Sequence, residues 1–273
     1  APILEVDWRS RVMAEVFDSR RILVYSDHQV VETEDPVVNE VPLTIMLNDS
    51  ELATLLCSPY ALEELVVGFL LSEGLVNGPD EVFSLQFRME QGVAWVDTVN
   101  PVSRVDSFLR RNFASCCGKG RPALYFVNDR DQLKTVETDA CFKAQHLLNL
   151  MAELDRQSEN FHLTGGVHGA ALADNNGIVV RYEDIGRHNA LDRILGYVYL
   201  HSIYPTDKIV LLSGRIASEM LIKTVRMRVP VVVSRSAPTG LAVDLAEELG
   251  VTIVGFARGE RMSIYSHPER IDF

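Results

Sequence analysis

Short apolar segments alternate with amphipathic segments in the second half of the chain, and this alternation constrains the fold more than any other feature. The apolar segments predict β-strands over residues 178–181, 208–212, 230–234 and 251–256. Between them, apolar residues at helical spacing predict helices over about 188–201, 216–228 and 240–249. Strands that alternate with helices favour a largely parallel sheet with helices on both faces, which is a three-layer α/β/α architecture.

The first half of the chain is patterned differently and predicts a small α+β domain. Its expected elements are strands over 41–47 and 51–56, a helix over 58–74, and strands over 82–87 and 92–97. Ser58, which precedes a proline, is the expected N-cap of that helix, and Gly74 is its expected end. Residues 1–35 are weakly patterned, with a strand expected around 21–25.

We therefore expect two domains, a small α+β domain over 1–105 and an α/β domain over 106–273. A further helix is expected from Thr138 or Asp139 to about Arg156. The glycine-rich segment that follows it, 164–172, is expected to form a strand or a loop in which backbones approach closely.

Each of the four expected strands is followed by at least one arginine, usually beside serine, threonine or glycine. These arginines are Arg187, Arg215, Arg235, Arg258 and Arg261. In parallel sheets ligands bind beyond the carboxyl ends of the strands, where helix N-termini favour anions. Because arginine also suits phosphate, the pattern predicts a site for a phosphate-bearing ligand. For any single arginine, an ordinary surface salt bridge is an equally good interpretation.

Two histidines belong to the same glycine-rich and polar turns. His168 follows a pair of glycines, and His188 follows Arg187. Either residue could be a structural histidine with satisfied hydrogen bonds, but their neighbours favour ligand contact for both. His267, beside a proline, is expected to be structural.

The segment 113–122 carries two adjacent cysteines, Cys116 and Cys117, followed by alternating glycines and cations. Adjacent α-carbons lie about 3.8 Å apart, whereas a relaxed disulfide needs about 4.4–6.8 Å, so at least one sulfur is expected to be free. Lys119 and Arg121 favour the reactive thiolate, and the glycines allow the loop to move. We expect a thiol that collects a group in one place and delivers it in another. The alternative is a pair of inert, buried cysteines.

Composition limits the remaining classes of function. There are 26 Lys and Arg against 38 Asp and Glu, a net charge of −12, which argues against nucleic acid and anionic membranes as partners. Four cysteines are too few for a disulfide scaffold and indicate a reducing compartment, most simply the cytoplasm; Cys57 and Cys141 are expected in the core. No apolar run could span a bilayer, and the first residues are acidic where a signal peptide would be basic. No zinc-binding motif occurs, so no metal is expected.

Several longer motifs occur in a fixed order and together resemble the FdhD/NarQ family. They are Thr164–His168, Glu183–Asp192, Ser213–Arg215, Ser236–Pro238, Gly255–Gly259 and Ile264–Arg270. The resemblance runs from about Asn39 to the C-terminus and implies a small α+β domain followed by a domain similar to cytidine deaminases. The zinc signature of the deaminases is missing, so their chemistry is not expected.

The resemblance also implies a function. Members of this family are sulfur carriers required for formate dehydrogenase activity. A cysteine desulfurase passes sulfur to a loop cysteine as a persulfide, and the carrier transfers it to the molybdenum (or tungsten) bis-guanine-dinucleotide cofactor, bound transiently. The partners implied are the desulfurase, the formate dehydrogenase apoenzyme and a second copy in a homodimer.

Carried over to this chain, the resemblance places the persulfide on Cys116. Many members have Cys-x-x-Cys in this loop, whereas Cys117 here is adjacent, so the division of labour between the two is open. The family's cofactor-binding stretch corresponds to Phe256, Ala257, Arg258, Gly259, Glu260 and Arg261, and the residues at the strand ends expected to join it are His168, Arg187, His188 and Arg215.

Two other functions are also compatible with the sequence. One is a cofactor chaperone that binds without a covalent step, with incidental cysteines. The other is a metal-dependent nucleotide hydrolase on a deaminase-like fold.

Overall fold

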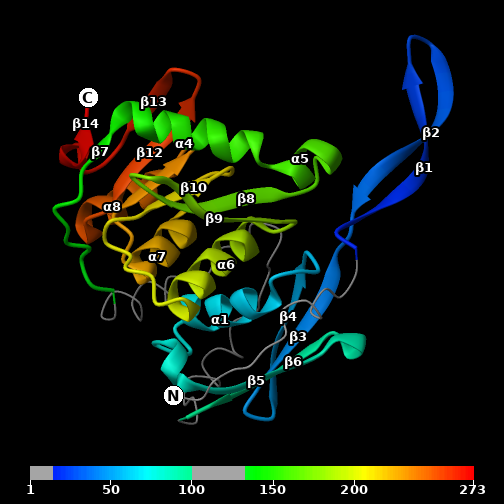
Figure 1. The fold of residues 1–273 in the computed structure, drawn as a ribbon, viewed down its shortest axis with the longest axis horizontal. Helices are drawn as coiled ribbons and strands as arrows, with labels where there is room; N and C mark the ends of the chain where they lie inside the picture. Colours follow the sequence, from blue (N-terminus) through cyan, green and yellow to red (C-terminus); the bar gives the residue numbers. More distant parts are fainter. Residues whose placement is uncertain (1–14, 100–132) are drawn as a thin grey trace.

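The computed structural model describes residues 15–99 and 133–273, and its largest element is a six-stranded sheet (Figure 1). The strands lie in the order β13-β12-β11-β10-β8-β9. Their bounds are β8 (His168–Asp174), β9 (Gly177–Asp184), β10 (Ile209–Leu212), β11 (Val231–Ser234), β12 (Thr252–Arg258) and β13 (Arg261–Ile264).

The sheet contains both parallel and antiparallel pairs. The four strands that the sequence predicted, β9, β10, β11 and β12, nevertheless run in the same direction, as expected. β10 pairs in parallel with β11, and β11 with β12. β8 is antiparallel to both β9 and β10, so β9 runs in the same direction as β10, β11 and β12. A tight turn in which the Asn176 N–H donates to Asp174 Oδ1 (2.8 Å) joins β8 to β9, which makes them a hairpin. The prediction missed two features: the position of β8 between β9 and β10, and the strand β13, which pairs antiparallel with β12 at the edge of the sheet.

Helices cover both faces of this sheet, as the alternation predicted (Figure 1). They are α4 (Ala144–Arg156), α5 (Glu159–Thr164), α6 (Arg187–Leu200), α7 (Ser218–Met227) and α8 (Gly240–Leu249). Successive strand residues point to opposite faces. Val210 and Leu212 of β10 accordingly belong to the buried cluster that includes α6, α7 and α8, whereas Ile209 and Leu211 belong to the cluster under α4. The three-layer α/β/α architecture is confirmed; its likeness to cytidine deaminases stays a prediction.

The first half forms a four-stranded sheet with one helix, as expected. The strands lie in the order β4-β3-β6-β5, and the bounds are β3 (Val41–Leu47), β4 (Ser50–Cys57), α1 (Leu62–Ser72), β5 (Val82–Arg88) and β6 (Val93–Thr98). The described residues also contain short elements: η2 (Pro79–Glu81), η3 (Met89–Gln91), β7 (Phe142–Lys143), η4 (Pro268–Arg270) and β14 (Ile271–Asp272). The boundary expected near residue 105 lies outside the described residues and stays a prediction.

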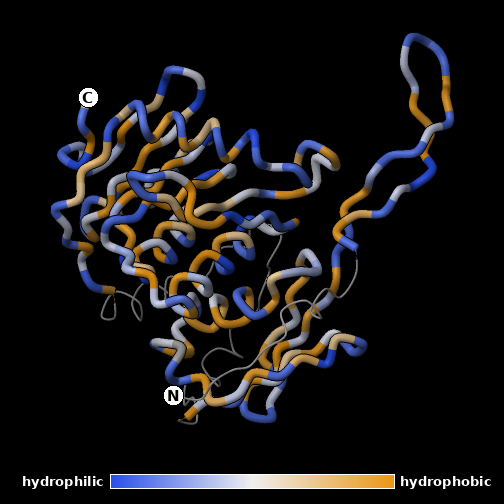
Figure 2. Tube along the Cα trace, in the orientation of Figure 1, coloured by the Kyte–Doolittle hydropathy of each residue, from blue (hydrophilic) through white to orange (hydrophobic). Residues whose placement is uncertain are grey.

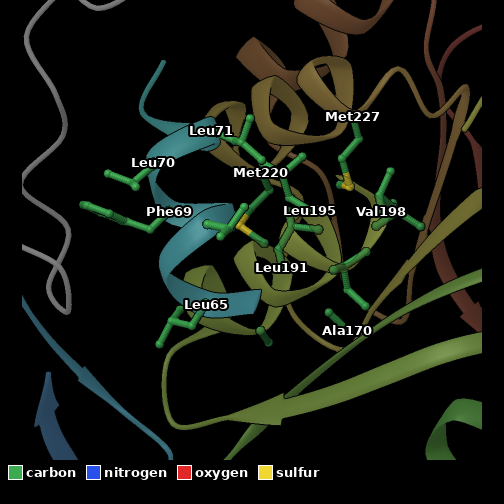
Figure 3. Close-up of a cluster of buried hydrophobic side chains, with 14 of the residues drawn as sticks. Leu65, Phe69, Leu70, Leu71, Ala170, Leu191, Leu195, Val198, Met220 and Met227 are labelled. Carbon is green, nitrogen blue, oxygen red and sulfur yellow. The ribbon is translucent and has the colours of Figure 1, made fainter. Parts of the chain in front are cut away.

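Helix α1 joins the two sheets. It is buried on nearly all sides because it packs on its own sheet and on α6, and Figure 3 shows its side chains beside Leu191 and Leu195 of α6 and Met220 of α7. The two helices cross at a pair of glycines. A Cβ atom on Gly68 would lie 1.7 Å from the Asp192 carbonyl oxygen, and one on Gly196 would lie 1.9 Å from the Glu64 carbonyl oxygen. Only residues without a side chain allow this approach.

A long hairpin, which we call the arm, consists of β1 (Phe17–Ser26) and β2 (Gln29–Val38) and extends away from the rest of the molecule (Figure 1). Its turn has positive φ at both central residues, Asp27 (50°) and His28 (63°), which matches the twist of the strands. The sequence predicted only part of β1. The strand β2 was missed because its apolar residues do not alternate regularly with polar ones.

Two expected helix starts were wrong. α1 begins at Leu62 rather than after Ser58, because the Ser58 hydroxyl accepts a hydrogen bond from the Ile185 N–H (3.3 Å) in place of capping the helix. α4 begins at Ala144 rather than near Thr138, because β7 first pairs in parallel with β14 at the C-terminus. Within the described residues, no helix is both long enough and apolar enough to cross a membrane.

Candidate functional site

The ends of β9, β10, β11 and β12 meet at one edge of the six-stranded sheet, as their common direction requires. Backbone and side-chain hydrogen bonds tie the segments that follow the strands to one another. Ser234 Oγ donates to the Gly214 carbonyl (2.6 Å), and the Phe256 N–H donates to the Ser236 carbonyl (3.1 Å). The expectation that the strand ends lie together is therefore confirmed. We call this edge the strand-end site.

His168, Arg187 and Gly214 form the centre of the strand-end site. β8 starts at this edge because it runs against its neighbours, and this places His168 beside the ends of β9 and β10. A Cβ atom on Gly214 would lie 3.6 Å from His168 Nδ1 and 3.8 Å from Arg187 Cδ, so both basic side chains lie close to this glycine. Among the residues that the structure describes, the buried Nε of Arg187 has no hydrogen-bond partner. An anion could supply one.

Helix N-termini add positive potential at this edge. α6 and α7 begin after Gly186 and Ala217, whose side chains cannot cap a helix, whereas Thr239 caps α8 by accepting from the Ala242 N–H (3.4 Å). Neither α6 nor α7 has a side-chain cap, and the positive end of each helix dipole lies at this edge, which suits an anionic ligand. His188 also lies at this edge, but it has an acidic neighbour: its Nε2 lies 3.5 Å from the Glu219 carboxylate in the first turn of α7.

The basic residues around the centre are more exposed. Arg215 is exposed, and Arg235 forms an exposed ion pair with Asp155 from α4. Arg258 and Arg261 are exposed and opposite each other in the β12–β13 hairpin. Salt-bridge pairing, the alternative interpretation of these arginines, thus holds for Arg235.

The expected cofactor-binding stretch covers the irregular end of β12 and the turn after it. Phe256 has φ of 52°, a left-handed conformation that is unusual for a bulky residue, at a point where the register with β13 shifts. Ala257 is buried, and Gly259 provides the positive φ (59°) of the turn before the exposed Glu260. Strained backbone of this kind concentrates at functional positions.

A buried polar network beneath the site was missed from the sequence. Arg193 of α6 is fully buried; its guanidinium forms an ion pair with Asp184 at the end of β9 and donates to the carbonyls of Ser58 (2.9 Å) and Tyr60 (3.0 Å). Asp184 also accepts from the Gly186 N–H (2.8 Å), just before Arg187. The network therefore holds the start of α6 against the loop between β4 and α1. One signal was available: Arg193 lies three residues after Ala190, on the apolar face of the predicted helix.

The cysteines are in three different situations. Cys116 and Cys117 lie outside the described residues, so their expected role stays a prediction. Cys57 is fully buried, as expected, and burial raises the pKa of its thiol to about 12. The expectation for Cys141 was wrong: its side chain is exposed and lines a cavity of about 620 Å³ beside His146. Its position in the irregular segment just before β7 explains the error, because no helical packing surface forms there.

Across the described ranges, 15–99 and 133–273, no cluster of three or more His, Cys, Asp or Glu side chains could hold a metal ion.

The fold and the strand-end site define a three-layer α/β protein with a basic, phosphate-compatible edge. The family model for the FdhD/NarQ family matches residues 38–272. The chain belongs to the FdhD/NarQ family, as its motifs indicated.

Its relatives are similar over nearly their whole length. The sulfur carrier protein FdhD of Bacillus licheniformis is 43% identical over 256 residues, which cover 93% of this chain and 97% of the relative. That of Geobacillus kaustophilus is 44% identical over 92% of this chain and 96% of the relative. A crystal structure from Desulfotalea psychrophila, described as a formate dehydrogenase accessory protein, superposes with a TM-score of 0.78 at 27% identity, over 94% of this chain and all of that one.

Proposed function

We propose that this protein is a sulfur carrier for formate dehydrogenase that acts as a sulfurtransferase. Its loop cysteine accepts sulfur from a cysteine desulfurase as a persulfide and delivers it to the molybdenum (or tungsten) bis-guanine-dinucleotide cofactor of the apoenzyme. The proposal is supported by the relatives named as sulfur carriers and by the formate dehydrogenase accessory protein of similar structure. Reduced thiols are required, so we place the reaction in the cytoplasm.

The observation that carries the proposal is that His168 and Arg187 lie together beside Gly214, and that the buried Nε of Arg187 has no partner within the described residues. A guanine dinucleotide offers a pyrophosphate, whose oxygens match the Arg187 guanidinium and the positive end of the α6 dipole. The exposed Arg215, Arg258 and Arg261 would contact the outer parts of such a large substrate. The cofactor would thus be held at the strand-end site as the substrate that receives the sulfur.

The loading step requires only the cysteine loop of this chain. The Cys116 thiolate attacks the outer sulfur of the desulfurase persulfide, the S–S bond of that persulfide breaks, and the desulfurase cysteine leaves as a thiolate. Cys116 is then the persulfide, and the step involves no net oxidation. Lys119 and Arg121 favour the attacking thiolate.

We expect Cys116→Ala to abolish persulfide loading. The chain is incubated with a desulfurase and cysteine, and mass spectrometry measures the added sulfur atom. Cys141→Ala is the matched control, because it removes an exposed thiol outside the cysteine loop and should load normally. Undiminished loading of Cys116→Ala would reject this cysteine as the acceptor. Full formate dehydrogenase activity with the double variant Cys116→Ala, Cys117→Ala would favour the non-covalent chaperone instead.

His168 reports on anion binding at the strand-end site. Partial burial and the positive charge of Arg187 lower the pKa of His168 from its ordinary value, because both disfavour the charged ring. We expect guanosine diphosphate to raise the pKa of His168, since phosphate charge beside Arg187 offsets that repulsion. NMR titration of the ring, assigned with His168→Gln, measures both values. An unchanged pKa under saturating nucleotide would place the ligand elsewhere.

A further inference from the structure

The segment that carries Arg187 into the strand-end site is built against the four-stranded sheet. Apolar packing holds α6 on α1, and Figure 2 shows hydrophobic residues in both helices. Apolar packing is not directional, however, so it does not fix the course of residues 184–187, which lead from β9 into α6. Hydrogen bonds to Leu56, at the end of β4, and to Ser58, just after it, supply that direction.

Asn189, in the first turn of α6, donates both hydrogens of its side-chain amide. One goes to the Leu56 carbonyl (2.8 Å) and the other to Asp184 Oδ1 (2.8 Å). Because both partners are acceptors, they fix the orientation of the amide. Leu56 belongs to β4, the edge strand of the four-stranded sheet, so this amide joins that sheet to the start of α6.

The bond from Asn189 to Asp184 passes this constraint on to Arg187. Asp184 Oδ1 also accepts from the Gly186 N–H (2.8 Å), and Arg187 follows Gly186 directly. In a capping box, the side chain of the third helical residue accepts the N-cap N–H itself. Here Asp184 accepts that N–H, and Asn189 donates to Asp184 instead. A Cβ atom on Gly186 would lie 3.0 Å from Asn189 Nδ2 and 3.4 Å from Asp184 Oδ1, so the three groups are closely packed.

We propose that Asn189 is a positioning residue for anion binding, which holds Arg187 at the strand-end site by tying the start of α6 to the edge of the four-stranded sheet. The inference rests on the proposed function for the identity of the anion. The buried Nε of Arg187 has no partner among the described residues. The position of this side chain therefore depends on the backbone that carries it, and Asn189 and Asp184 fix that backbone.

Asn189→Leu tests the proposal, because leucine has nearly the same shape as asparagine but no amide. We expect the dissociation constant for guanosine diphosphate to rise about tenfold, the effect of losing one or two hydrogen bonds. Isothermal titration calorimetry measures it. Asn149→Leu is the matched control: Asn149 is exposed on α4, its side chain accepts from Gln145 of the same helix (3.1 Å), and its loss should leave the affinity unchanged.

The pKa of His168 without nucleotide provides a readout that a purely structural role would not change. Partial burial and the positive charge of Arg187 lower this pKa in the wild type. If Arg187 is no longer held in place in Asn189→Leu, less positive charge faces the ring, and the pKa should rise toward its ordinary value. NMR titration of the ring measures the pKa in wild type, Asn189→Leu and Asn149→Leu.

Asn189 is only partly buried, so folding should survive; circular dichroism and thermal unfolding check this. Asn189→Ala, which removes the amide without adding apolar surface, is the second variant and should give the same results. An unchanged pKa of His168 in the folded variants overturns the proposal, and so does an unchanged affinity for guanosine diphosphate. A wild-type chain that does not bind the nucleotide contradicts the proposed function instead, and the pKa of His168 then decides the role of Asn189.

Discussion

Arg193→Ala is expected to lower the free energy of unfolding by about 3–5 kcal/mol, because it leaves a buried carboxylate without its partner. Arg193 and Asp184 are both fully buried and form an ion pair. The remaining guanidinium hydrogen bonds go to the carbonyls of Ser58 and Tyr60, which would also lose their donor. The Coulomb interaction of the two charges is only one part of this effect. The larger part is the cost of burying Asp184 alone.

Chemical denaturation of wild type and variant measures the effect, and a surface pair provides the control. Arg235→Ala removes an ion pair with Asp155 in which both side chains are about two-fifths exposed, and it should cost no more than about 1 kcal/mol. The double variant Arg193→Met, Asp184→Asn removes both charges and should recover part of the loss. If Arg193→Ala cost as little as Arg235→Ala, the buried network would not hold the start of α6 as inferred.

Gly196→Ala should destabilise the protein by about 3 kcal/mol or more, although alanine is the better helix former. Helix propensity alone predicts a gain of about 1 kcal/mol. The added Cβ atom would lie 1.9 Å from the Glu64 carbonyl oxygen, however, and α1 and α6 could not keep their distance. Forced separation of packed helices costs more than the propensity gain, since interiors are close-packed. Gly68→Ala should behave in the same way, because its Cβ atom would meet the Asp192 carbonyl oxygen.

Gly240→Ala is the matched control for the helix crossing. Gly240 is the first residue of α8, and a Cβ atom there would have open space around it. The variant should be neutral or slightly stabilised. Thermal and denaturant unfolding of the three alanine variants separates the effect of helix packing on stability from the effect of helix propensity. Equal stability of Gly196→Ala and Gly240→Ala would show that the helices can separate at little cost.

The regular elements and the family could be predicted from the sequence because their signals are local. The strands β10, β11 and β12 and the helices between them follow from apolar periodicity. Because these strands run in the same direction, the basic residues that follow them, among them Arg215 and Arg235, come to one edge of the sheet. The ordered motifs identified the family without any contact being known. Local signals were weaker for the arm, where β2 has no regular alternation.

Only the tertiary structure decided which residues meet from distant parts of the chain. The insertion of β8 beside β10 put His168 next to Arg187, and the crossing of α1 and α6 required Gly68 and Gly196. Contacts with residues far away in the sequence likewise determine that Arg193 is buried and that Cys141 is exposed. Residue type and spacing determine which secondary structure a segment can form by itself. Contacts between segments depend on how the whole chain packs, and the periodicity of the sequence does not specify that packing.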